Sequence, residues 1–144
     1  MADLDPLIRF RKFNLEEKQK FLARLYAEAD KLLQLREGVL DQIEKEKDVL
    51  SQGDLDSFVA SSGFGHFLYK ARAEVEEIKK QEQLLDTRIG IAIEDMRESF
   101  GELKKIEITQ RQRMEQERKR LLKRENDMFE EIGLTRFISG EDQI

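Results

Sequence analysis

The sequence predicts an all-α protein in which two long helices form an antiparallel coiled-coil hairpin, with the second helix overhanging the first. One observation is a pair of apolar stripes of equal length, at residues 8–50 and 64–106, that repeat every 3.5 residues. Another is the segment 53–63 between the stripes, the only convincing break in the chain. The composition agrees, because 40% of the 144 residues are charged and the chain has one proline and no cysteine.

The first helix is expected over residues 6–52. Asp5 is expected to cap it, and Pro6 suits the first helical position, where a missing backbone N–H costs nothing. A ladder of alternating three- and four-residue steps from Ile8 to Leu50 is apolar at nine of its thirteen positions, and its polar positions are Arg11, Lys18, Arg36 and Glu46. Gly53 and the Asp, Ser and Gly residues after it supply turn chemistry, so we expect a turn over residues 53–63.

The second helix is expected over residues 64–132, where the corresponding ladder is apolar at eleven of thirteen positions. Antiparallel pairing of the two ladders places residue i opposite about 114 − i, so the second helix extends beyond the first. A separate apolar stripe follows the paired section: Met114, Leu121, Met128 and Ile132. Residues 133–144 are expected to form a C-terminal tail in which residues 139–144 fray, and residues 1–144 a single coiled-coil domain.

Several function classes find no support in the residues. No run approaches 18 apolar residues, and the start of the chain lacks the apolar segment of a signal peptide, so we expect a soluble cytoplasmic protein. His66 is the only histidine, which together with the absence of cysteine leaves almost no ligand set for a metal ion. A two-helix rod also offers no enclosed pocket, so we expect neither enzyme activity nor a cofactor.

Two features of one end of the rod suggest a partner. Residues 109–124 hold seven Lys or Arg against two Glu in a chain of net charge −5. This segment has no intramolecular partner, so its cations are expected to project free and to seek an acidic protein surface, nucleic acid or anionic lipid. At the same end, Phe10 and Phe13 either fold onto the second helix near Leu103 or form an exposed patch typical of a protein interface.

Three segments carry a family resemblance: LIRFRKFNLEEKQKFLARL near the start, FLYKARAEVEEIKKQEQLL at the opening of the second helix, and ERKRLLKRENDMFEEIGLTRF near the end. With the hairpin and its overhang, they resemble the FliJ family of flagellar type III export proteins over nearly the whole chain. The resemblance implies a coiled coil similar to the central stalk of rotary ATPases. It also implies a role in flagellum biogenesis and motility, in the cytoplasm and peripherally at the inner face of the cell membrane at the flagellar base.

The partners implied by the resemblance are the hexameric flagellar export ATPase, the cytoplasmic domain of the export gate membrane protein, and export chaperones. It implies that the residues facing the ATPase ring are Phe10, Phe13, Arg113, Arg118, Lys119, Arg120, Lys123 and Arg124. The residues facing the gate would be Phe67, Ala71, Glu74 and Ile78. Ala71 and Ile78 also lie on the predicted seam between the helices, and one face cannot serve both contacts at once.

Two alternatives remain open. A generic coiled-coil scaffold or tether would act as a homodimer, with the apolar stripe of the first helix, which is wider than two helices alone require, and the stripe from Met114 to Ile132 pairing between chains. A nucleic-acid-binding basic helix would require affinity that falls steeply with salt. The export interpretation, in contrast, expects no nucleic acid and no direct insertion into a membrane.

Overall fold

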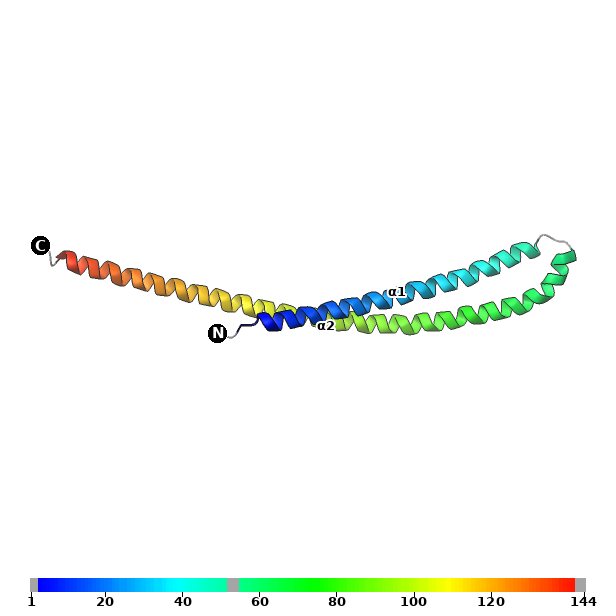
Figure 1. The fold of residues 1–144 in the computed structure, drawn as a ribbon, viewed down its shortest axis with the longest axis horizontal. Coiled ribbons are helices and arrows are strands. Elements are labelled where there is room, and N and C mark those ends of the chain that lie inside the picture. Colours follow the sequence, from blue (N-terminus) through cyan, green and yellow to red (C-terminus); the bar gives the residue numbers. More distant parts are fainter. Residues whose placement is uncertain (1–2, 52–54, 142–144) are drawn as a thin grey trace. The chain divides into compact units, whose positions relative to one another are not determined.

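The computed structural model describes the backbone of residues 3–51 and 55–141, together with their side chains except those of residues 55–62 and 141. Two helices account for most of this part of the chain: α1, Asp5–Leu50, and α2, Leu55–Glu141 (Figure 1). The described residues form no strand. The helices pack against each other, which confirms the predicted all-α helical hairpin.

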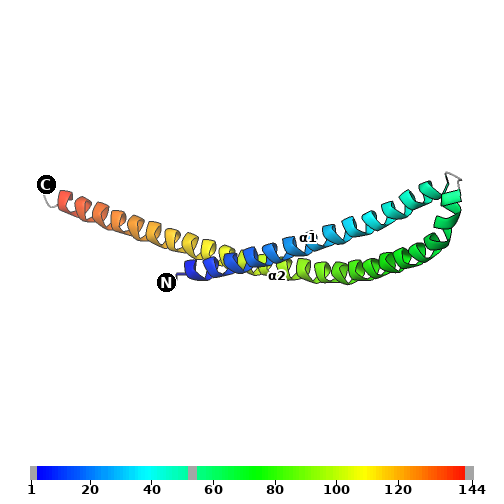
Figure 2. The same cartoon turned by 45° about the vertical axis from the view of Figure 1, so that its right-hand side comes forward.

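The chain divides into two compact units, each with parts of both helices. Residues 1–12 and 100–144 make up one of them, here called the terminal unit. Residues 13–99 make up the other, here called the turn unit. Within each unit, α1 and α2 lie side by side and run in opposite directions (Figures 1 and 2). The prediction of one domain over the whole chain stays a prediction.

The beginning of α1 differs slightly from the expectation. Asp5 is the first residue of the helix rather than its cap. Its backbone N–H donates to Oδ1 of Asp3 over 3.0 Å, so the side chain two residues earlier satisfies this free donor. An acidic residue in the first turn still favours the positive end of the helix dipole.

The predicted turn over residues 53–63 and the tail over residues 133–144 are both shorter than expected. Helical backbone resumes at Leu55 and continues to Glu141. The physical reason is that Ser and Gly inside a helix cost only about 0.5–1 kcal/mol each relative to Ala, which neighbouring helix formers offset. Residues 142–144, where fraying was also expected, lie outside the described part of the chain.

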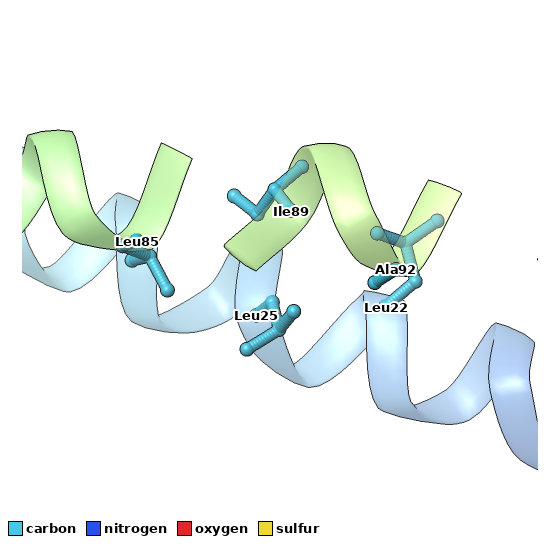
Figure 3. Packing of buried hydrophobic residues seen from close by; sticks show 5 residues of the cluster. All are labelled: Leu22, Leu25, Leu85, Ile89 and Ala92. Carbon is cyan, nitrogen blue, oxygen red and sulfur yellow. The ribbon is translucent and has the colours of Figure 1, made fainter. Parts of the chain in front are cut away.

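The core of the turn unit is a single layer of side chains between the two helices. Leu22 and Leu25 of α1 form a cluster with Leu85, Ile89 and Ala92 of α2 (Figure 3). All five lie on the two predicted ladders, so the sequence pattern identified the buried faces. Leu25 is the most completely buried, with 1% of its surface exposed.

In the terminal unit, α1 covers only the first part of the α2 segment. Asp5, the first residue of α1, accepts a hydrogen bond through Oδ1 from Nε2 of Gln110 over 2.6 Å. Beyond this contact, every described residue from 118 to 140 is exposed. Residues 111–141, here called the overhang, form a single helix of about 46 Å at about 1.5 Å per residue. The predicted overhang is therefore present.

Candidate partner-binding surfaces

The basic stretch of the overhang is partly neutralised by its own helix. Arg118 donates from Nη2 to Oε1 of Glu115 over 2.6 Å and from Nε to Oε2 over 3.2 Å. Arg120 donates a single hydrogen bond from Nη2 to Oε1 of Glu117 over 2.7 Å. The expectation that both arginines project free was wrong, because a glutamate three residues earlier lies on the same side of the helix.

The bidentate pair changes the titration of both its members. The hydrogen bond from Arg118 holds the pKa of Glu115 below its ordinary value, with smaller contributions from the positive charges of Arg118 and Lys119, against a partial desolvation that raises it. Glu115 in turn raises the pKa of Arg118. Both groups are charged at neutral pH at their ordinary pKa values, and the pair extends the pH range over which each stays charged.

Three other cations of this stretch keep their charge available to a partner. Within the described residues, no ion pair involves Lys119, Lys123 or Arg124, and all three side chains are exposed. Arg113 is half-buried beside the last residues that α1 covers. Arg113 also lacks an ion pair in the described structure, so the predicted ring-facing set contains four unpaired cations, three of them exposed, rather than a uniform basic face.

The two aromatic residues of the predicted ring-facing set belong to different units. Phe10 lies in the terminal unit with 56% of its surface exposed, and Phe13 lies in the turn unit with 57% exposed. Both side chains are therefore more than half exposed, which agrees with the exposed arrangement of the two that the sequence left open. Only Phe10 can be grouped with the basic overhang as part of one described unit.

A groove in the terminal unit follows the end of the two-helix section. Ile8 and Met114 supply apolar surface there, and the charged side chains of Lys12, Glu115 and Arg118 line it as well. Sequence reasoning did not select Lys12 or the groove, although the antiparallel register placed the start of α1 beside residues 106–114. The sequence signal that could have identified this groove was the antiparallel register of the two ladders, because it determines which residues of α1 lie beside the start of the overhang.

The predicted gate-facing residues are only partly brought together. Phe67, Ala71 and Glu74 line a groove of the turn unit together with Leu35 and Val39 of α1. Phe67 is half-buried and Glu74 exposed, whereas only 5% of the surface of Ala71 is exposed. Ala71 therefore contributes mainly to the base of the groove.

Ile78 does not belong to this groove. It is buried in the seam, with 6% of its surface exposed. The sequence left open whether Ile78 packs in the seam between the helices or faces a partner. It packs in the seam, because burial of its apolar side chain against α1 is favourable in free energy.

A second groove of the turn unit is lined by four leucines together with charged and amide side chains. Leu32 and Leu35 of α1 line it with Leu84 and Leu85 of α2, and Arg88 lies at its side. Leu84 is 69% exposed, which is unusual for a leucine beside the core. The sequence signal was the width of the apolar stripe, which exceeds what one neighbouring helix can cover.

Searches for other kinds of site give negative results within the described residues. Neither helix has a stretch apolar enough to cross a membrane. No group of three His, Cys, Asp or Glu side chains is arranged to hold a metal ion among residues 3–51 and 63–140. His66 is exposed. Comparisons of the chain with protein families, curated proteins and solved structures gave no match.

Proposed function

We propose that the chain is a FliJ-like, non-enzymatic component of the flagellar protein export apparatus. In this role it binds and stimulates the hexameric export ATPase, couples it to the export gate and escorts export chaperones at the inner face of the membrane. The observation that carries the proposal is the overhang, a bare helical end whose Lys119, Lys123 and Arg124 lack ion pairs in the described structure.

The shape of the overhang suits insertion into a ring. A single α-helix with its side chains is about 10–12 Å across, narrower than the two-helix section that follows it. Exposed cations on such a helix would be attracted to acidic side chains that line an opening, and this attraction increases the rate of association. Phe10, exposed in the same unit, would add apolar contact area where the helix pair begins.

We place the gate contact at the groove of the turn unit that Phe67, Ala71 and Glu74 line. Ile78, the fourth residue of the predicted gate-facing set, is not part of it. Phe67 and Glu74 line that groove and remain accessible, whereas Ile78 is committed to the seam. A partner that fits would offer an apolar side chain for Phe67 and a basic or amide group for Glu74. The leucine-lined groove beside it is a suitable seat for an amphipathic helix of an export chaperone.

ATP hydrolysis by a purified hexameric export ATPase tests the ring contact. Addition of the intact chain is expected to raise the rate, and a variant carrying Lys119→Glu, Lys123→Glu and Arg124→Glu is expected to lose this stimulation. The matched control reverses the same number of cations on the turn unit through Lys45→Glu, Lys79→Glu and Lys80→Glu.

Circular dichroism of both variants checks that the helix content is unchanged. If both variants stimulate as well as the native chain, the overhang does not face the ring. If both fail equally, overall charge rather than the overhang governs binding. Pull-down with the intact chain and with residues 1–106 is expected to recover the ATPase only with the longer form.

A scaffold or tether that acts as a homodimer is the second candidate. The exposed apolar side chains of the overhang favour it, because two copies could cover them mutually. Under this function, purified chain would have no effect on the ATPase, even at concentrations that saturate its own association.

A further inference from the structure

One flank of α1 in the turn unit carries apolar side chains that α2 does not cover completely. Tyr26, Leu33 and Leu40, here called the apolar row, are seven residues apart and therefore lie in line along the helix. They are between 37% and 51% exposed. Leu35, which belongs to the leucine-lined groove, lies on the opposite flank of the seam. The apolar row is therefore separate from the surfaces described above.

Acidic side chains accompany the apolar row at every step. Asp30, Glu37 and Glu44, here called the acidic row, each follow a member of the apolar row by four residues, so they lie next to it. All three are exposed. Within the described residues no ion pair involves Asp30 or Glu37, and Asp30 accepts a hydrogen bond from Nε2 of Gln34 over 3.1 Å. Glu44 has a loose ion pair, 3.6 Å from Nζ of Lys47. Most of the negative charge of this row is therefore available to a partner.

The two rows border a groove whose other wall is α2. Leu40 and Glu44 line its first part together with Arg72 and Lys79 of α2. Val75 of α2, which is 6% exposed, lies at its base. An apolar side chain of a partner could therefore rest on Leu40 and Val75, with charged groups on either side.

The α2 wall continues beside the rest of the rows. Gln83 and Asp86 lie seven residues after Glu76 and Lys79, which line the first part, so they occupy the same side of α2. They line a second hollow with Ala29 of α1. The hollows thus follow the rows along residues 26–44, about 27 Å at about 1.5 Å per residue.

We infer that this face of the turn unit binds a basic amphipathic helix of another protein. Such a helix would place apolar side chains at heptad spacing against the apolar row, and Lys or Arg along the edge that meets the acidic row. It would be about 18–20 residues long, which matches the length of the two rows. Bound in the groove, it would complete a three-helix bundle around the seam.

The overhang of a second copy matches the acidic row only in part. Its residues Met114, Leu121 and Met128 have the required heptad spacing. At the third step, however, the stripe is flanked by Glu125 on one edge and by Asp127 on the other. Either edge would therefore bring an acidic side chain to the acidic row, whereas a helix with a cation at every step would not.

The same face of a second copy does not fit either. In an antiparallel contact the two acidic rows would lie beside each other, and like charges in such positions are destabilising. In a parallel contact each acidic row would lie beside the α2 wall of the other copy. That wall contains Asp86, and its Lys79 is already paired with Glu76 at 3.5 Å. Charge complementarity therefore favours a different protein.

The inference does not depend on the proposed export function. The face lies across the seam from the groove that Phe67 and Glu74 line, so both surfaces can be occupied at once. Failure of the ATPase test would leave this binding face unaffected, and the reverse also holds.

Two synthetic amphipathic peptides of about 21 residues, three heptads, test the charge preference. Both carry leucines along one face, and they differ only along one edge, which is lysine in one peptide and glutamate in the other. Fluorescence anisotropy with the intact chain at physiological ionic strength is expected to give a Kd below about 100 µM for the lysine-edged peptide and a Kd at least about tenfold higher for the glutamate-edged one. A Kd above about 100 µM for the lysine-edged peptide, or equal Kd values for both, would overturn the inference.

Charge reversal of the acidic row tests the contact from the side of the protein. Asp30→Lys with Glu37→Lys and Glu44→Lys is expected to exchange the preference, so that the glutamate-edged peptide binds more tightly. The matched control makes the same change in net charge at exposed acids elsewhere in the turn unit: Glu17→Lys, Glu77→Lys and Glu98→Lys. It is expected to change the Kd of the lysine-edged peptide less than about threefold. Equal losses in both variants would show that only net charge matters and would contradict the inference.

Circular dichroism is expected to show the same helix content in both variants, because Lys and Glu have similar helix propensities. If the reversed row unfolds the chain, the native chain still tests the inference through the two peptides.

Photocrosslinking locates the bound peptide. A benzophenone side chain at the centre of the apolar face of the lysine-edged peptide is expected to crosslink to Tyr26, Leu33 or Leu40, as read by mass spectrometry of digests. Crosslinks to Leu35 or Leu84 would place the peptide in the leucine-lined groove and overturn the assignment.

Sedimentation equilibrium of the chain alone tests the remaining occupant. A native monomer, or a dimer that the reversed acidic row leaves intact, would agree with a face that is open to another protein. A native dimer that the reversed row dissociates and the matched control does not would assign the face to a second copy, and the inference would be wrong.

Discussion

Arg36 of α1 donates from Nε to Oε1 of Glu82 of α2 over 2.8 Å, across the seam of the turn unit. Both side chains are less than a third exposed. Each occupies a polar step on a ladder that is otherwise mostly apolar, and the antiparallel register brings the two steps together. A shift of one heptad would separate them and leave each charge beside apolar side chains, so the pair specifies the register.

Removal of one member of this pair is expected to destabilise the turn unit. Glu82→Ala leaves Arg36 half-buried without its acceptor, and a loss of about 1–2 kcal/mol in the free energy of unfolding is expected, since the site is partly solvated. Urea denaturation followed by circular dichroism measures it. The exchanged pair, Arg36→Glu with Glu82→Arg, is expected to recover most of the loss. Equal losses in the single and exchanged variants would show that the contact does not contribute.

Shortening a side chain of the core cluster is expected to destabilise the turn unit, although this core is only a single layer of side chains. Leu25→Ala removes a side chain that is 1% exposed and should lower the free energy of unfolding by about 2–4 kcal/mol, the range for a buried leucine. Leu84→Ala, at a leucine that is 69% exposed in the same unit, is the matched control and should cost less than about 0.5 kcal/mol. Similar costs at both positions would contradict the assigned seam.

Two glycines inside α2 are expected to be sites of easy stabilisation. A Cβ added at Gly90 or Gly101 would meet nothing within 4 Å, so no close approach of the helices requires glycine there. Gly90→Ala is therefore expected to raise the free energy of unfolding by up to about 1 kcal/mol. Thermal melts measure the gain, and Ala73→Gly, at an exposed position of the same helix, should produce a loss of similar size. A lower melting temperature for Gly90→Ala would indicate that the helix must bend there.

The titration of Glu115 provides a direct test of the ion pair in the overhang. Because the folded-state pKa of this carboxyl is lowered, chiefly by Arg118, the pair stabilises the helix above the ordinary pKa of glutamate. This contribution is lost as pH falls through the lowered value. NMR titration should show the pKa of Glu115 rising towards its ordinary value in Arg118→Gln. Lys119→Gln, which removes only a minor charge effect, should move it less. An unchanged pKa in Arg118→Gln would exclude the bidentate pair.

Hydrophobic periodicity was sufficient to predict the hairpin, its seam and its overhang. The buried residues of the core cluster all lie on the ladders, because a two-helix contact repeats every 3.5 residues and leaves a regular record in the sequence. The limits of the helices were less predictable. Ser and Gly in residues 55–65 weaken a helix without stopping it, and Gly133 likewise lies within α2.

The candidate surfaces were harder to predict than the fold. The ion pair between Arg118 and Glu115 depends on the rotamers of both side chains, which the composition does not reveal. A count of positive charges therefore overestimated the number of cations without an ion pair. The predicted gate-facing set combined exposed Glu74 with buried Ile78. A residue on the ladder is buried between the two helices, and it is then not accessible to a partner. The leucine-lined groove arises from the width of a stripe, a property that indicates excess apolar surface but not its occupant.

The contact between Asp5 and Gln110 also separates a protected part of the terminal unit from an unprotected one. Trypsin cleaves after Lys and Arg where the backbone opens locally, and from Arg118 onward, where every described residue is exposed, such opening disrupts little besides the helix's own hydrogen bonds. Brief digestion of dilute chain is expected to release fragments cut after Lys119, Lys123 or Arg124 first, as read by mass spectrometry, with cleavage after Arg88 only later. A copy that is cut there keeps the residues of the terminal unit that α1 covers but loses the exposed end of α2, so any partner that binds the overhang would slow this cleavage.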